Sequence, residues 1–171
     1  VQTCALPILP ILIVVAWVRA DAAARFDLLL VLLAAGLGLL LAEATTFVWP
    51  QPRPFALHVG TQYLEPSLRP GLPSDHVTLF WSVALATLHT RRFALWGFPL
   101  LAVGLVVGWS RIYLGLHFPL DIAAAFPVAW AATMLARALR QPLTPTFMRV
   151  LLLHDRWVNR LRSRIHAFRK T

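Results

Sequence analysis

The sequence predicts an all-α, polytopic membrane helix bundle of about five helices, and three observations lead to this fold class. Of the 171 residues, 58% are hydrophobic and 13% are charged, and the mean hydropathy is +0.68. The apolar residues form runs of membrane-spanning or nearly membrane-spanning length. The basic residues lie mainly between these runs and in the last thirty residues. This composition excludes a water-soluble domain of average type, and the length excludes a two-domain enzyme.

Each apolar run in the first part of the chain predicts one helix. Residues 5–18 are short for a span and contain two prolines, so we expect a truncated or interfacial helix there. Residues 19–27 are expected to form a short charged turn. Residues 28–49 predict a full span of about 33 Å, which ends because prolines follow at every second position. Glu43 in this run is expected to be either a functional carboxylate or a protonated carboxyl bonded to a neighbouring helix.

The middle of the chain predicts three further helices after one long connection. That connection covers residues 50–73 and is rich in proline and glycine, and connections of this length are often functional. The helices are expected over residues 74–88, 93–109 and 119–139. Gly104 and Gly108 form a small-xxx-small pair, which indicates close helix packing.

The chain is expected to divide into a membrane-embedded part, residues 1–141, and a basic amphipathic cytoplasmic tail, residues 142–171. The arginines of this tail favour anionic membrane lipid as its partner, and nucleic acid is not expected. The chain begins with Val1 and enters an apolar stretch without a basic n-region, so we expect that an N-terminal piece is missing. Cys4 is the only cysteine, which excludes an intramolecular disulfide and a cysteine-based metal cluster.

The distribution of basic residues predicts the orientation of the bundle. If the long connection lies outside, then thirteen of the sixteen arginines and lysines lie inside. The three outside are Arg53, Arg69 and Arg111. The positive-inside rule strongly favours this arrangement. The long connection and the expected turn over residues 110–118 then share the outer face, where their polar residues can meet.

Polar side chains gather at three helix ends on this outer face. The clusters are Arg53-Pro54, Pro73-Ser74-Asp75-His76, and Ser110-Arg111 with His117 and Asp121. Taken singly, Arg53 fits an interface arginine and Ser74 fits an N-cap. His117 with Asp121 fits a structural hydrogen bond. Their coincidence on one membrane face favours a functional site.

These residue types are suited to a phosphate group. Arginine forks match phosphate oxygens, and a helix that begins with Pro-Ser presents backbone N–H groups to an anion. His117 and Asp121 are four residues apart, so one helical turn can hold them together, with Asp121 fixing the tautomer. His117 is then suited to attack phosphorus in line. His76 is suited to protonate the leaving oxygen and later to deprotonate water. No metal is required in this scheme, because the arginines supply the charge stabilisation.

The spacing of these motifs resembles the signatures of the type 2 phosphatidic acid phosphatase superfamily of membrane lipid phosphatases. Ser110-Arg111, five residues, His117, three residues and Asp121 are similar to the third signature, and Pro73-Ser74-Asp75-His76 to the second. Asp75 stands where the commonest form has glycine, and aspartate there resembles the bacitracin-resistance undecaprenyl-diphosphate phosphatases. The first signature is a lysine, six residues and Arg-Pro. Arg53-Pro54 match it, but Thr46 stands at the lysine position.

The resemblance implies the six-helix lipid phosphatase fold without its first helix, and a site without a cofactor or metal. It implies His117 as the nucleophile, Asp121 as its orienting partner, and His76 as acid and base. The residues expected at the substrate are Arg53, Ser74, Asp75, Arg111 and Thr46. We expect the Thr46 hydroxyl or His58 to replace part of the missing lysine.

The resemblance also implies an integral membrane hydrolase of the bacterial cytoplasmic (inner) membrane, with its site facing the periplasm. The expected reaction is hydrolysis of undecaprenyl diphosphate to undecaprenyl phosphate and phosphate, a step in the recycling of peptidoglycan precursors. Two alternatives stay open. One is a phosphatase for phosphatidylglycerophosphate, phosphatidic acid or lipid A phosphate, and the other is a lipid-phosphate carrier that binds without hydrolysis. Transport favours polar residues at mid-membrane, whereas these cluster at one end.

Overall fold

The structure, a computed structural model, describes residues 8–59 and 69–168, and every regular element within these ranges is a helix. The α-helices are α1 (Ile8–Arg19), α2 (Ala22–Val48), α3 (Asp75–Leu88), α4 (Ala94–Tyr113), α5 (Pro119–Ala138) and α6 (Arg140–Phe168). A short 3-10 helix, η1 (Pro54–Leu57), lies in the connection between α2 and α3. The predicted all-helical fold class is therefore confirmed.

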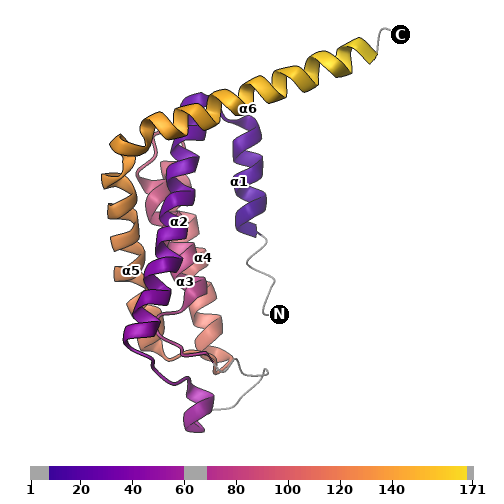
Figure 1. Cartoon of the computed structure of the whole chain (residues 1–171). Helices are drawn as coiled ribbons and strands as arrows, with labels where there is room; N and C mark the ends of the chain where they lie inside the picture. The colour runs from indigo at the N-terminus through magenta and orange to yellow at the C-terminus, as the bar shows by residue number, and fades with distance from the viewer. Residues whose placement is uncertain (1–7, 60–68, 169–171) are drawn as a thin grey trace.

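Helix α3 forms the centre of the bundle and contacts α2, α4 and α5 (Figure 1). Nine of its 14 residues are buried. After Asp75 and His76, its sequence is apolar on every side apart from small hydroxyl residues, which is typical of an internal helix. Phe80 and Val77 of α3 pack in the core with Ala34 of α2 and with Ala125 and Ala129 of α5. Alanines at these positions let the neighbouring helices approach closely.

Three of the described helices are long and apolar enough to cross a bilayer: α2, α4 and α5. Their outward faces carry exposed apolar side chains, among them Leu40, Phe47, Val106 and Trp130. Surface of this kind is suited to the hydrocarbon of a membrane. Helix α3, with 14 residues, is too short to be counted among these spans.

The prediction of a charged turn over residues 19–27 is wrong, because α2 already begins within this range. Asp21 is the N-cap, and its Oδ1 accepts a hydrogen bond from the Ala24 N–H at 2.9 Å. The charges that follow do not interrupt the helix, because α6 supplies their partners. Arg25 Nη1, for example, lies 2.8 Å from Asp155 Oδ1.

Helix α4 extends further than predicted, because the residues from Ser110 onward continue it instead of forming a turn. The Ser110 hydroxyl donates to Val107 O at 2.7 Å and is thus satisfied inside the helix. The chain turns at Gly115, whose φ of 69° favours glycine, and Leu116 N donates to Arg111 O at 3.0 Å. Arg111 therefore projects from the last turn of a helix and not from a loop.

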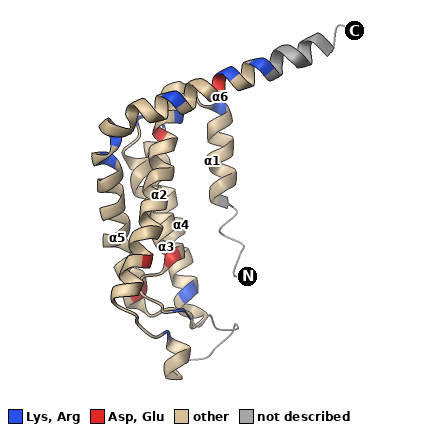
Figure 2. Cartoon of the chain, viewed as in Figure 1, with Lys and Arg blue, Asp and Glu red and all other residues tan. Residues whose placement is uncertain are grey.

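Helix α6 lies across one end of the bundle and extends beyond it (Figure 1). The Phe147 ring packs edge-on against Phe26 of α2, with the centroids 5.8 Å apart, and Leu151 is buried. The basic tail predicted from the sequence is thus helical and packed on the bundle. Figure 2 shows that arginine gathers along α6 and at the helix ends beside it.

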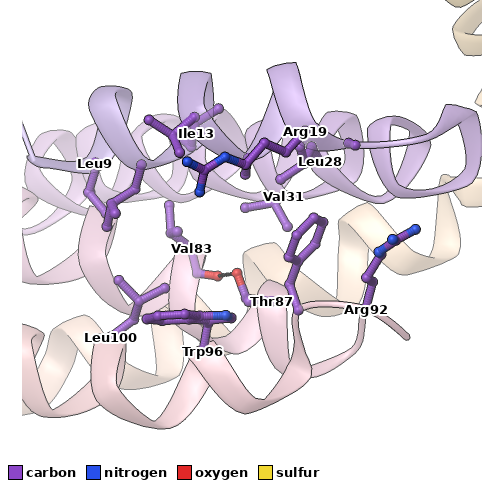
Figure 3. Close-up of a pocket in the computed structure, with 15 residues that line it drawn as sticks. Leu9, Ile13, Arg19, Leu28, Val31, Val83, Thr87, Arg92, Trp96 and Leu100 are labelled. Atoms are coloured by element: carbon purple, nitrogen blue, oxygen red, sulfur yellow. Dashed lines mark hydrogen bonds between the residues drawn. The ribbon is translucent and has the colours of Figure 1, made fainter.

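A cavity of about 500 Å³ lies between α1 and the neighbouring helices (Figure 3). Its lining is apolar, for example Leu9, Val83 and Leu100, except for Thr87 and the two arginines Arg19 and Arg92. None of the predicted site residues lines it. The cavity therefore reflects the loose packing of α1 and does not mark the site.

Gly104 and Gly108 pack closely against neighbouring side chains, as predicted. We therefore expect Gly104→Ala to destabilise the contact between α3 and α4. A Cβ at Gly104 would lie 2.6 Å from two ring atoms of Trp81, whose indole N–H donates to Leu101 O at 3.2 Å. The midpoint of thermal unfolding in detergent should fall by several degrees, as for an overpacked core that loses about 1–3 kcal/mol.

The matched control is Gly36→Ala, because a Cβ at Gly36 meets nothing within 4 Å. Its midpoint should stay the same or rise, since alanine favours a helix over glycine by about 1 kcal/mol. Equal midpoints for the two variants would contradict the packing described for Gly104.

Candidate active site

The segments that carry the predicted site residues lie at the end of the bundle opposite α6, where backbone hydrogen bonds join separate parts of the chain (Figure 1). Gly71 N donates to Gln51 O at 2.9 Å, which closes the long connection on itself. Ser74 N, just before α3, donates to Asp121 O in α5 at 3.1 Å. These bonds fix the beginnings of α3 and α5 beside each other.

His117 is held by two acceptors at one ring nitrogen. Its Nδ1 lies 3.0 Å from Gly71 O and 3.3 Å from Asp121 Oδ2. Because a carbonyl and a carboxylate can only accept, Nδ1 carries the proton in neutral imidazole, and Nε2 keeps its lone pair. The predicted pairing of His117 with Asp121 is thus present. Gly71 O is a second acceptor for this nitrogen. Glycine suits position 71, since a Cβ there would lie only 3.1 Å from Asp121 Oδ2.

Asp121 and Ser74 are fully buried, and each has a side-chain oxygen that lacks a hydrogen-bond partner among the described residues. Asp121 Oδ2 accepts from Phe118 N at 2.8 Å, whereas Oδ1 is the unpartnered atom. Ser74 occupies the N-cap position of α3 as predicted, but its hydroxyl makes no capping bond. The first N–H groups of α3 are therefore not capped by this side chain. Buried polar atoms without partners are uncommon and point to a water or ligand.

Two arginines bring positive charge to this end of the bundle. Arg53 is half-buried, and its Nε–H donates to Arg69 O at 2.8 Å. Burial lowers the pKa of the Arg53 guanidinium, while Asp75 and Asp121 raise it, and arginine stays charged at neutral pH. Arg111 is buried in the last turn of α4, where its charge and that of Arg53 repel each other. A bound anion would relieve this repulsion.

Asp75 and His76 lie half-buried in the first turn of α3, outside the three candidate spans. Burial, with the charges of Arg111, His117 and Arg53, lowers the pKa of His76 to about 4. The imidazole is therefore neutral at pH 7 when no anion is bound. Burial raises the pKa of Asp75, and the charge of Arg69 opposes this effect. Because the charge of His117 contributes to the lowered pKa of His76, the two histidines lie at the same end of the bundle.

Thr46 and His58 are expected from the sequence to replace part of the missing lysine, but the contacts described for them are with backbone carbonyls. The Thr46 hydroxyl donates its proton to Leu72 O at 2.8 Å, which ties α2 to the segment before α3. His58 is exposed at the end of η1, and its backbone N–H donates to Phe55 O at 3.1 Å. The substrate contact predicted for Thr46 stays a prediction, but its one hydroxyl proton is already used.

Sequence reasoning missed two features of this end of the bundle. One is the contact between the Gly71 carbonyl and His117. This contact depends on the path of the connection, and its only signal in the sequence is the glycine itself. The other is an ion pair between Glu43 and Arg69, whose Nη2 lies 2.7 and 2.8 Å from the two carboxylate oxygens. Glu43 is exposed, and the partner of its carboxyl is Arg69 of the connection and not a neighbouring helix.

The donor set at this end is suited to an anion and not to a cation. Within the part of the chain that the structure describes, no group of three or more His, Cys, Asp and Glu side chains is placed to hold a metal ion. The polar groups that converge are instead arginines, histidines, a serine and helix N–H groups, which bind phosphate oxygens. Fold and site together define the class of helical membrane proteins with a candidate site suited to a phosphate group.

Comparison with known proteins identifies the family. The PAP2 superfamily profile matches residues 27–145. "Putative undecaprenyl-diphosphatase YbjG" of Escherichia coli K12 is 34% identical over 116 residues, 67% of this chain and 58% of that protein. "Undecaprenyl-diphosphatase BcrC" of Bacillus subtilis is 31% identical over 124 residues, 72% of this chain and 63% of that protein. "Bacitracin transport permease protein BcrC" of Bacillus licheniformis is 37% identical over 75 residues, 42% of this chain and 35% of that protein.

The chain belongs to the PAP2 superfamily, since the family match covers more than half of it. The resemblance seen in the three signatures is thereby confirmed. The chain spans 58% and 63% of the length of the first two relatives. No solved structure matches the chain.

Proposed function

We propose that this protein is a membrane phosphatase that hydrolyses lipid phosphates through a phosphohistidine, with His117 as the nucleophile. The observation that carries this proposal is the anchoring of His117 Nδ1 by Gly71 O and Asp121 Oδ2, at 3.0 and 3.3 Å. This leaves Nε2 as a nucleophile of fixed direction. Asp121 is a positioning residue in this scheme, because it holds the imidazole and stabilises its charged form.

In the first step, the His117 Nε2 lone pair forms a bond to phosphorus while the bond from phosphorus to the leaving oxygen breaks. His76 gives a proton to that oxygen, and the lipid product leaves. In the second step, His76 takes a proton from water, the water oxygen bonds to phosphorus, and the bond between phosphorus and Nε2 breaks. Inorganic phosphate is released and His117 is restored. Arg53, Arg111 and Ser74 hold the phosphate oxygens, together with the N–H groups that begin α3.

Undecaprenyl diphosphate is the proposed substrate. The support is the similarity to relatives that are named undecaprenyl-diphosphatases and the aspartate at position 75 of the second signature. A site at the end of a membrane bundle also suits a ligand with an apolar tail and a charged head. One relative is named a transport permease, so binding without hydrolysis is the second candidate function. The histidine geometry favours the phosphatase, because a carrier has no need of an oriented nucleophile.

A phosphate-release assay on purified protein in detergent tests this function. We expect release from undecaprenyl diphosphate that is faster than from phosphatidylglycerophosphate, phosphatidic acid or lipid A phosphate. His117→Ala should lower the rate by about a thousandfold or more, because the variant lacks the proposed nucleophile. His89→Ala, which changes an exposed histidine at the other end of α3, should leave the rate unchanged. Substrate binding without any phosphate release by the unmutated protein would instead support the carrier.

The role of His76 has a separate test with an aryl phosphate whose phenolate leaves readily. With such a substrate the first step does not need an acid, whereas the second still needs a base. In His76→Ala we therefore expect a burst of phenolate close to one equivalent per protein, followed by slow turnover and an acid-labile phosphoprotein. Steady turnover without a burst, at the unmutated rate, would show that His76 is not the base.

The protein is further proposed to lie in a bacterial cytoplasmic (inner) membrane, with the site facing the periplasm and α6 on the anionic inner leaflet. The support is the concentration of arginine at the α6 end of the bundle (Figure 2). In a Cys4→Ser background, Ala56→Cys in η1 should react with a membrane-impermeant thiol reagent added to cells whose outer membrane is permeable. Gln141→Cys in α6 should react only after the inner membrane is opened. The reverse pattern would refute this orientation.

A further inference from the structure

The first signature of this chain lacks its lysine, and the residue in that place does not supply a cation. Thr46 is neutral, and its hydroxyl donates a hydrogen bond to Leu72 O. Arg53, the other charged member of that signature, is present and half-buried at the site. A phosphate site that relies on side-chain charge needs its cations, because desolvated anionic oxygens are costly without them. The missing charge has to come from elsewhere in the chain.

Arg69 lies beside the position of the missing lysine. Its Nη2 is 2.7 and 2.8 Å from the two carboxylate oxygens of Glu43 on α2. Glu43 precedes Thr46 by three residues, and residues at this spacing share one face of a helix, with their Cβ atoms about 5–6 Å apart. The carboxylate thus holds the guanidinium within one helical turn of the place where a lysine at position 46 would begin.

Arg69 is also joined to the rest of the first signature. Its carbonyl oxygen accepts the Arg53 Nε–H at 2.8 Å. Its charge acts on Asp75 and on Arg53, which are both site residues. The side chain of Arg69 is 64% exposed, so a ligand can reach the guanidinium without displacing buried structure. Arg69 therefore meets the requirements of position, charge and access.

We propose that Arg69 supplies the phosphate-binding cation that the first signature lacks, and that Glu43 positions it. This inference rests on the proposed function, since it assigns Arg69 to the phosphate oxygens of the same lipid substrate. Arg69 binds these oxygens through its guanidinium and takes no part in proton transfer. Its loss should therefore raise KM far more than it lowers kcat. Glu43 acts through Arg69 as a positioning residue.

The test compares KM and kcat for a polyprenyl diphosphate in detergent among Arg69 variants. Arg69→Gln should raise KM on the order of tenfold to hundredfold, as for the loss of a charge-assisted hydrogen bond. Arg69→Lys should recover most of this loss. Arg91→Gln, at an exposed arginine beyond the other end of α3, is the matched control and should leave KM unchanged.

The decisive variant adds the family's lysine to the defective protein. Thr46→Lys in the Arg69→Gln background should lower KM towards the unmutated value, because the charge returns to the same phosphate. If Arg69 only anchors the connection, then Arg69→Gln and Glu43→Gln reduce kcat and the unfolding midpoint alike. The new lysine would then recover nothing, and that result overturns the proposal. An unchanged KM in Arg69→Gln overturns it as well.

Two controls keep the outcomes distinct. If Thr46→Lys alone lowers the unfolding midpoint, the role of Arg69 is tested by comparing KM of Arg69→Lys with KM of Arg69→Gln. A recovery of KM by lysine at position 69 depends on its charge. If the unmutated protein releases no phosphate, the proposed function fails and the role of Arg69 falls with it. If the protein releases phosphate but its KM does not change in the Arg69 variants, only the proposed role of Arg69 is refuted.

Discussion

One buried carboxylate determines the arrangement of this end of the bundle. Asp121 Oδ2 accepts from Phe118 N at 2.8 Å and lies 3.3 Å from His117 Nδ1, while its backbone oxygen accepts from Ser74 N at 3.1 Å. Asp121 therefore caps α5, orients an imidazole and fixes the beginning of α3. A buried carboxylate is stable only when such partners surround it, so the geometry of the site and the stability of this end depend on the same contacts.

The parts of the fold that could be predicted are those whose signals are local. Helix α3 begins two residues after Pro73 and helix α5 begins with Pro119, and both continue through mainly apolar runs, so their bounds agree with the expectation to within about a residue. The beginning of α2 could not be predicted, because Arg25 and Asp27 read as a break in the apolar pattern. Charged side chains are compatible with a helix, and Asp155 and Arg140 of α6 come near these two in space.

The same distinction separates the parts of the candidate site. The pairing of His117 with Asp121 follows from a spacing of four residues on one helical turn, and it could be predicted from the sequence. The Gly71 carbonyl contacts His117, and the Arg69 guanidinium contacts Glu43, from a connection without periodicity. No pattern in the sequence states which of its atoms return to α2 or α5. From the sequence alone, Thr46 at the lysine position therefore indicates the loss of a cation. In the structure, Arg69 contacts Glu43, which precedes Thr46 by three residues.

The electrostatics of the site link the binding of an anion to the protonation of His76. Burial lowers the pKa of His76 to about 4, and the charges of Arg111, His117 and Arg53 add to this effect, while Arg53 and Arg111 also repel each other. A phosphate between these groups brings negative charge, which offsets the arginines and raises the pKa of His76. Substrate binding therefore favours the protonated imidazole. In the proposed reaction the acid is thus formed by the ligand that needs it, and a neutral His76 in the free protein is consistent with a catalytic role.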